Sequence, residues 1–323
     1  MTPTNPQSQP RQEPNPLAAL IGSLISEPGD LDTAIPSLTL YKRLSPTINQ
    51  AVGYLPPSVC LIGQGSKSVV IGEESLTYDA QRYLVTTLDL PVATWVTKAT
   101  SQRPYLALRL TLERQTMIEL FLETTHWPGQ PRESERAIYV SEVDPGLLDA
   151  FIRLLRLLSS PRDIPVLAPL IKKEICYRLL VGEQGPRLRQ IISETSRSNH
   201  ISKAIEWLKE NYAKSIRVDW LASLSGMSQS NFFQQFRSFT ALSPLQYQKK
   251  LRLIEARRIM LEENKEVANA AFQVGYESPS QFSRDYARLF GASPRQDLKS
   301  LHDELAFEPA KVRAHEGGLT PTA

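Results

Sequence analysis

Two similar stretches, 50 residues apart, carry the side chains in this sequence that are best suited to contact another molecule. They are MSQSNFFQQFRSFTALSP, residues 227–244, and ESPSQFSRDYARLFGASP, residues 277–294. Each combines Gln, Ser and Arg with aromatic residues at helical spacing. Gln, Ser and Arg hydrogen-bond to the edges of DNA bases, and a Phe ring can contact the methyl group of thymine. The chemistry that these stretches predict is the reading of a base sequence.

The order of residues within each stretch predicts a helix. Ser278 is a good N-cap residue, Pro279 suits the first helical position, and Gln281 completes a capping box with Ser278. Gly291 then ends the helix. Ser228 has the same place as Ser278 in the earlier stretch. Aromatic residues at an offset of 50 are expected to form the buried stripe of each helix: Phe232 and Phe282, Phe236 and Tyr286.

Each of these helices follows a shorter helix and a glycine turn, which is the order of a helix-turn-helix motif. The predicted motifs span residues 217–239, with a turn at Gly226, and 266–290, with a turn at Gly275. The second helix of such a motif, the recognition helix, lies in the major groove of DNA. The outer faces of the two recognition helices are expected to present Gln229, Ser230, Phe233, Gln234 and Arg237, and Ser280, Gln281, Arg284 and Arg288.

A basic helix over residues 244–261 connects the two motifs. At 1.5 Å per residue it forms a rod of roughly 27 Å. Two recognition helices on such a rod could enter successive major grooves, which are about 34 Å apart. Leu253, Ala256 and Met260 are expected to face its core. Basic side chains predicted to contact phosphates, or in the rod to form salt bridges, are Arg237, Lys249, Lys250, Arg252, Arg257, Arg258 and Arg288.

The charge distribution agrees with a phosphate-facing surface in the second half of the chain. Residues 196–300 hold 16 Lys and Arg against 10 Asp and Glu, whereas residues 1–195 hold 19 against 20. A local excess of positive charge attracts nucleic acid, although an excess of this size is also common on an ordinary solvated surface.

Residues 200–300 resemble the DNA-binding domain of AraC/XylS-type regulators. The resemblance is carried by MSQSNFFQQF, RLIEARRIML and VGYESPSQFSRDYARLFGASP. The first half departs from the family at Phe233, where a small polar residue is common, and at Ala241, where glycine is usual. We therefore expect the first recognition helix to end without a left-handed residue. The resemblance implies that the bases are contacted by Ser230, Phe233, Gln234, Pro279, Ser280, Gln281 and Arg284.

The first half of the chain has two patterns. Short runs rich in β-branched and aromatic residues, such as VCLIG (59–63) and YLALRLTL (105–112), alternate with turn residues between about 35 and 112. This pattern predicts an antiparallel sandwich or barrel. From residue 145 apolar residues recur every three or four positions, which predicts two amphipathic helices joined by SSPRDIP. Their apolar faces could pack on the barrel or on the same hairpin of a second subunit.

This half also resembles a known family. IPSLTLYKRLSPT, LPPSVCLIGQGSKSVVIGEESLTYDAQRYLVTTLDLPV and RPYLALRLTLE are similar to the N-terminal domain of AraC-type regulators, over residues 35–195. The resemblance implies a cupin-like effector barrel with a sensory and dimerising role, and it names no ligand. The predicted fold is α+β with two domains: an N-terminal cupin-like antiparallel β-barrel with a helical hairpin, and a C-terminal all-α double helix-turn-helix.

These patterns together predict the domain boundaries. The expected parts are a disordered arm (1–16), the effector barrel (17–143), the helical hairpin and linker (144–195), the DNA-binding domain (196–302) and a disordered tail (303–323). The arm and the tail are rich in Pro and polar residues, with little to bury.

Two residues of the predicted barrel are candidates for sensing an effector. Cys60 is either a small buried hydrophobe or a thiol that senses an electrophile or oxidant, which requires a lowered pKa of the thiol. Arg109 lies inside the apolar run LALRLTL, where a charge must be paired or exposed. It is either an outward strand residue or an anchor for an anionic effector.

Metal-dependent catalysis in the barrel is not expected. Metal-binding cupins need two or three histidines and a carboxylate. Of the four histidines only His126 lies near the barrel, and no H-x-H occurs. The sequence has no G-x-S-x-G nucleophile motif and no P-loop either. We therefore expect no metal and no cofactor.

The predicted function is that of a sequence-specific DNA-binding transcription regulator that responds to a small molecule or reactive species. No apolar run is long enough to span a membrane, no signal peptide is evident, and two cysteines give no disulfide framework. These features predict a cytoplasmic protein, associated with the nucleoid when bound to DNA. Expected partners are double-stranded DNA, an unknown small-molecule effector and a second copy of the chain, with RNA polymerase as a further candidate. Two alternatives stay open: a metal-free cupin-like enzyme fused to a DNA-binding domain, and a C-terminal protein-interaction module.

Overall fold

The computed structural model describes residues 15–47, 50–124, 127–128, 136–192 and 197–302. The predicted tail, residues 1–14 of the predicted arm, and His126 lie outside these residues. Helix α1 (Pro16–Leu24) begins after Asn15, whose side chain accepts a hydrogen bond from Leu17 N–H.

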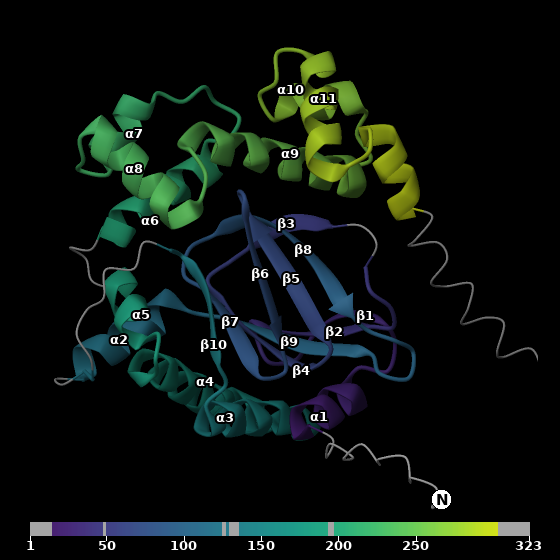
Figure 1. Cartoon of the computed structure of the whole chain (residues 1–323), viewed down its shortest axis with the longest axis vertical. Helices are drawn as coiled ribbons and strands as arrows, with labels where there is room; N and C mark the ends of the chain where they lie inside the picture. Colours follow the sequence, from purple (N-terminus) through teal and green to yellow (C-terminus); the bar gives the residue numbers. More distant parts are fainter. Residues whose placement is uncertain (1–14, 48–49, 125–126, 129–135, 193–196, 303–323) are drawn as a thin grey trace, which may run out of the picture.

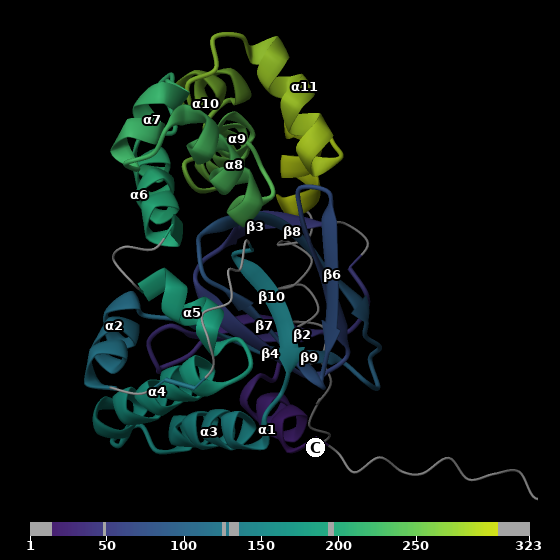
Figure 2. The same cartoon turned by 60° about the vertical axis from the view of Figure 1, so that its left-hand side comes forward.

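Two antiparallel sheets form the N-terminal part of the chain (Figures 1 and 2). The six-stranded sheet has the order β1-β2-β9-β4-β7-β10, and the four-stranded sheet has the order β3-β8-β5-β6. The strands are β1 (Gly29–Asp32), β2 (Leu38–Arg43), β3 (Ala51–Leu55), β4 (Ser58–Gln64), β5 (Ser66–Ile71), β6 (Glu74–Asp79), β7 (Arg82–Thr86), β8 (Leu90–Lys98), β9 (Tyr105–Thr111) and β10 (Ile138–Glu142). The predicted barrel-like antiparallel fold is confirmed.

Strand β4 shows how the sequence separates the two faces of the six-stranded sheet. Successive strand residues point to opposite faces. Val59 and Leu61 belong to the apolar cluster that includes residues of the neighbouring helices. Cys60 and Ile62 belong instead to the cluster that includes residues of the four-stranded sheet. The barrel interior is therefore the Cys60 side of β4.

Helices cover the outer face of the six-stranded sheet, at the bottom of Figure 1. They are α1, α2 (Arg114–Glu123), α3 (Pro145–Arg156), α4 (Ile164–Val181) and α5 (Gly185–Ile192), with a short 3₁₀ turn at Leu157–Ser159. The predicted helical hairpin is α3 and α4. Phe151 and Leu154 of α3 are fully buried in the same cluster as Val59, so the hairpin packs on the barrel.

The remaining helices lie on the opposite side of the barrel (Figures 1 and 2). They are α6 (Arg197–Glu210), α7 (Val218–Leu224), α8 (Gln229–Thr240), α9 (Pro244–Glu262), α10 (Val267–Gln273) and α11 (Pro279–Phe290). The first motif is α7–α8 and the second is α10–α11, with α9 between them. Within the described ranges, no helix is long and apolar enough to cross a membrane.

Candidate nucleic-acid interface

Helix α8 turns an aromatic stripe inward and a polar face outward. The Ser228 side chain accepts a hydrogen bond from the backbone N–H of Asn231 and begins the helix. Phe232 and Phe236 are fully buried, as their spacing predicts. The predicted base-contacting residues of this helix, Ser230, Phe233 and Gln234, are exposed, as is Arg237. Phe233 is 42% exposed, which makes it available for an apolar contact.

Helix α11 repeats this arrangement. Pro279 is its first residue, and Ser278 accepts a hydrogen bond from Gln281 N–H at 3.4 Å. Only this half of the predicted capping box forms, so the exposed Gln281 amide is left to contact other molecules. Ser280 and Arg284 are exposed beside it, and Pro279 is half-buried. The predicted reading face is therefore on the surface in both motifs.

The buried aromatic pairs of the two recognition helices have the same geometry. The ring centroids of Phe232 and Phe236 lie 5.5 Å apart with an interplanar angle of 53°. Phe282 and Tyr286 have the same distance and the same angle. The offset of 50 in the sequence is therefore a repeat in the structure.

One expectation about the first motif is wrong. Ala241 ends α8 with φ 56° and ψ 14°, which is left-handed, as Gly291 does for α11 with φ 79°. Its N–H donates to Arg237 O at 2.8 Å, so the backbone bond that ends a helix is retained. The alanine adopts this conformation in spite of its Cβ, at a cost of roughly 1–2 kcal/mol.

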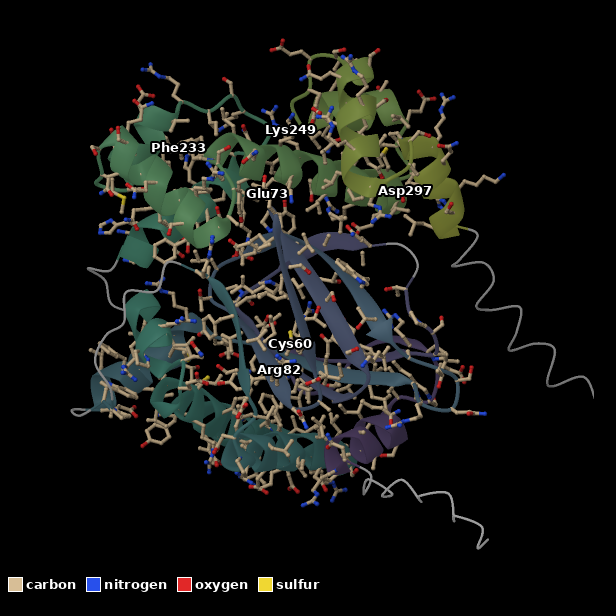
Figure 3. The ribbon with its side chains drawn as sticks, in the orientation of Figure 1. Cys60, Glu73, Arg82, Phe233, Lys249 and Asp297 are labelled. Carbon is tan, nitrogen blue, oxygen red and sulfur yellow. The ribbon has the colours of Figure 1, made fainter. Side chains whose placement is uncertain are left out.

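An open groove of about 890 Å³ separates α8 from α11 and runs over α9. Among the residues that line it are Phe233, Gln234, Arg237, Lys249, Lys250 and Arg288, all of which are predicted to contact DNA. The turn between β5 and β6 lines the same groove with Gly72, Glu73 and Glu74; Figure 3 labels Glu73 and Lys249. Sequence reasoning missed these acidic residues, because nothing in the first half of the chain indicates contact with the second.

The predicted phosphate-contacting residues differ in solvent exposure and in whether they form an ion pair. Arg237 is exposed, and Arg288 is 82% exposed and lies 3.8 Å from the Asp285 carboxylate. Lys249 Nζ lies 3.1 Å from the Asp285 carboxylate. Burial lowers the pKa of Lys250. These four side chains all line the groove.

Arg252 has a different environment. Its guanidinium donates to the backbone oxygens of Tyr212, Ala213, Lys214 and Gly275, at 2.7–3.2 Å. Arg252 therefore joins the end of α6 to the turn of the second motif. Its contact with phosphate stays a prediction, and the structure gives it a structural task that its basic neighbourhood in the sequence did not indicate.

The rod α9 is fixed at its start and in its core. Ser243 and Gln246 form a full capping box. Leu253, Ala256 and Met260 are buried, as predicted. The alternative of salt bridges is the one that the structure shows for two other arginines: Arg257 with Asp297, and Arg258 with Glu255 and Glu262.

The two effector-sensing candidates lie together inside the barrel. Arg109 is directly opposite Cys60 in the β4–β9 pairing, and residues opposite each other share a face. The alternative of an outward-facing Arg109 is therefore wrong. Burial raises the pKa of the Cys60 thiol, although Lys67 and Arg109 act in the opposite direction. This environment favours packing over reactivity for Cys60; its role as a sensor stays a prediction.

The interior also holds a basic residue that the sequence analysis did not single out. Lys67 shares a strand face with Val69 and Ile71, which are buried between the sheets. Period-two alternation along KSVVIG was the signal that could have placed it. In the part of the chain that the structure describes, no group of three or more His, Cys, Asp or Glu side chains is arranged to hold a metal ion.

Comparison with known families agrees with both parts of the fold. Residues 34–187 match the family described as the AraC-type transcriptional regulator N-terminus, and residues 221–300 match a helix-turn-helix domain family. The chain belongs to the AraC-type family of transcriptional regulators. Its fold, an N-terminal antiparallel β domain followed by a double helix-turn-helix, is the one that the sequence predicts.

Curated relatives support this assignment. The transcriptional activator RhaS of Escherichia fergusonii is 29% identical over 147 residues, 45% of this chain and 51% of that protein. The regulator ExsA of Pseudomonas aeruginosa is 25% identical over 130 residues, 40% of this chain and 46% of that protein. The chain thus spans about half the length of the curated relatives it matches.

A solved structure extends the similarity of the fold to both domains. The crystal structure of ToxT from Vibrio cholerae, bound to an unsaturated fatty acid, covers 85% of this chain and 97% of its own with a TM-score of 0.55. The sequence identity is 13%, so this similarity concerns the fold.

Proposed function

We propose that this AraC-type regulator binds two successive major grooves of DNA through α8 and α11, and that a small molecule held in the barrel modulates this binding. The observation that carries the proposal is the structural repeat: two recognition helices with matching buried cores present polar, exposed outer faces on one rod. In this division of tasks residues 17–143 sense, 144–195 transmit or dimerise and 196–302 read DNA. No catalytic step is assigned to the barrel.

Selection of bound sequences from a random DNA pool tests the DNA-binding part. The full-length protein should enrich two non-palindromic blocks about one helical turn apart, because each recognition helix reads one block. No enrichment, or binding that never exceeds the nonspecific range of about 10⁻⁴–10⁻⁶ M, would favour a protein-interaction module instead.

Variants of three arginines separate base contacts from phosphate contacts. Arg284→Ala should weaken binding by about 1–3 kcal/mol and relax specificity at one position. Arg288→Ala should weaken all sequences alike and reduce the salt dependence by about one phosphate contact. Arg162→Ala is the control, because Arg162 is exposed in the turn between α3 and α4, on the far side of the barrel. Equal losses at every sequence for Arg284→Ala and Arg288→Ala would contradict the assignment.

The proposal includes a homodimer formed through α4. Ile175 and Leu179 of α4 are buried in the apolar cluster of the neighbouring helices and the outer face of the barrel, but Val166 and Leu170 are 67% and 61% exposed. Apolar side chains gathered on one helix are typical of a contact with another subunit. Analytical ultracentrifugation of a Val166→Glu, Leu170→Glu double variant should show a monomer, while Leu31→Glu, on an exposed edge strand, should leave a dimer intact. A monomeric wild-type protein would contradict this part.

RNA polymerase is a further proposed partner, and the nucleoid the proposed location of the DNA-bound form. Transcription from a promoter carrying the selected site, measured with purified polymerase, tests the first. An unchanged transcript level at saturating regulator would contradict direct action on polymerase at that promoter.

A further inference from the structure

Two cationic side chains, Lys67 of β5 and Arg109 of β9, lie inside the barrel, and among the described residues neither has an acidic partner. Lys67 Nζ lies 5.7 Å from the centroid of the Tyr41 ring, and the Arg109 guanidinium carbon lies 5.8 Å from the same centroid. The two cations thus lie around one aromatic ring. Arg109 Nε is buried and has no hydrogen-bond partner within the described part of the chain.

The acidic residues nearby are engaged elsewhere. Asp30 forms an ion pair with Arg43, and Asp32 accepts a hydrogen bond from Thr39 at 2.8 Å. Among the described residues, no carboxylate lies within ion-pair distance of Lys67 or Arg109. Buried charges in proteins are normally paired, because an unpaired charge in an apolar interior costs much free energy.

The surroundings give the missing partner its chemical character. Tyr78 is opposite Lys67 in the β5–β6 pairing, and Cys60 is opposite Arg109 in the β4–β9 pairing, so aromatic and weakly polar groups flank the cations. Lys67, Arg109 and Tyr41 all keep part of their surface accessible to solvent, whereas Tyr78 is buried. A ligand can therefore approach the cations while its remaining part contacts the Tyr41 ring.

We propose that Lys67 and Arg109 form a binding site for a small organic anion, a carboxylate or a phosphate ester, inside the barrel. An arginine fork binds such groups through two parallel hydrogen bonds, and a lysine adds a point charge. Burial lowers the pKa of Lys67, as expected for a cation that lacks its counter-charge in the ligand-free protein. The inference rests on the proposed function in that the bound anion is the effector.

The experiment measures thermal unfolding of the full chain without DNA, so its failure is distinguishable from failure of the DNA-binding proposal. The probes are benzoate, inorganic phosphate and the uncharged benzamide, at constant ionic strength. The variants are Lys67→Met and Arg109→Met. Lys98→Met is the matched control, because Lys98 is exposed at the end of β8 and its replacement removes the same charge.

At least one anion should raise the Tm of the wild type and of Lys98→Met by about 2–4 °C or more, and benzamide should not. Lys67→Met and Arg109→Met should lose this response. In low-salt Tris buffer without probe, Lys67→Met should unfold at a higher temperature than the wild type, because one unpaired buried charge is gone. Response to phosphate alone would identify a phosphate site, and response to benzoate alone a carboxylate site.

Three results would overturn the proposal. One is the absence of any rise in the wild-type Tm with the probes. Another is a rise of equal size in the wild type and in both interior variants. The third is a lower Tm of Lys67→Met than of the wild type in the absence of probe, which would mean that Lys67 already has its partner.

Discussion

The two helix-turn-helix motifs have equivalent buried aromatic pairs, but a different residue completes the packing around each pair. Against the first motif, the ring of Tyr247 of α9 packs edge-on on Phe236, with centroids 5.5 Å apart, and its hydroxyl donates to Asp89 O of the barrel at 2.6 Å. Fifty residues later the equivalent position is Asp297. It accepts a hydrogen bond from Tyr286 at 2.6 Å and pairs with Arg257 at 2.7 Å.

The two motifs also belong to different apolar clusters. Phe232, Phe236 and Tyr247 belong to the same apolar cluster as the inner face of the barrel. Phe282 and Tyr286 belong to a separate cluster built from α9, α10 and α11. The first motif therefore shares its apolar core with the barrel interior, whereas the second motif has a core of its own.

Further contacts between described residues tie the first motif and α6 to the barrel. Ala137 N–H donates to Phe239 O at 3.1 Å, and Lys209 of α6 lies 3.0 Å from the Asp89 carboxylate. The turn between β5 and β6 approaches so closely that a Cβ at Gly72 would lie 2.6 Å from Ala241 O. This contact lies at the left-handed end of α8, where the second motif has an open Gly291.

The largest expected effect comes from removing Asp297, which pairs with Arg257 and accepts a hydrogen bond from Tyr286 beside the second motif. Asp297→Ala leaves Arg257, whose side chain is 19% exposed, without its partner and removes the acceptor of the Tyr286 hydroxyl. We expect a loss of about 3–5 kcal/mol of local stability. Hydrogen exchange of the full chain should show α11 losing protection while α8 keeps it.

Asp219→Ala is the control for this variant, since Asp219 pairs with Arg217 at 2.6 Å on the open surface and should leave both motifs unchanged. Equal loss of protection in α8 and α11 after Asp297→Ala would show that the two motifs unfold as one unit, against the separation of their cores.

The turn glycines, Gly226 and Gly275, provide a second test of how the two motifs differ. Gly226 and Gly275 both have positive φ, 64° and 86°, so alanine is strained at either position by roughly 1–2 kcal/mol. A Cβ at Gly275 would also lie 2.0 Å from Ala213 O, whereas at Gly226 the nearest atom is 3.9 Å away. Gly275→Ala should therefore cost about 1–3 kcal/mol more than Gly226→Ala in denaturant unfolding. An equal loss of stability in the two variants would mean that the backbone at Ala213 moves to make room for the added Cβ.

Features of the two motifs that depend on contacts close in the sequence could be predicted, whereas those that depend on distant contacts could not. The cores were predictable, because Phe232 and Phe282 repeat at a fixed offset with caps and turns around them. The places of Arg252 and Glu73 were not, because Arg252 bonds to Tyr212, which is distant in the sequence, and Glu73 lines a groove with helices of the second half of the chain. Helix α1 was also missed, although Ile21 is fully buried, because its short apolar run follows a Pro-rich arm.

A smaller effect is expected from loosening the first motif. Tyr247→Phe removes one hydrogen bond to the barrel and keeps the ring. The free energy of unfolding should therefore fall by about 0.5–1.5 kcal/mol. The readout is hydrogen exchange at residues 87–89, which should quicken. Tyr286→Phe is the matched control, because it removes a hydroxyl from the second motif and should leave these residues unaffected. A response of residues 87–89 to Tyr286→Phe would contradict the separation of the two cores.

The smallest effect concerns the groove that both motifs share. Glu73 is exposed in the turn that lines this groove, next to the side chains predicted to contact phosphates (Figure 3). Its negative charge opposes the approach of DNA, so Glu73→Gln should tighten binding to the selected site by about 0.2–1 kcal/mol. Glu27→Gln, an exposed charge outside the groove, should change nothing. Because exposed charges are screened by salt, the gain should shrink between low and high ionic strength. A gain of equal size at low and high salt would contradict an electrostatic effect of Glu73 on DNA binding.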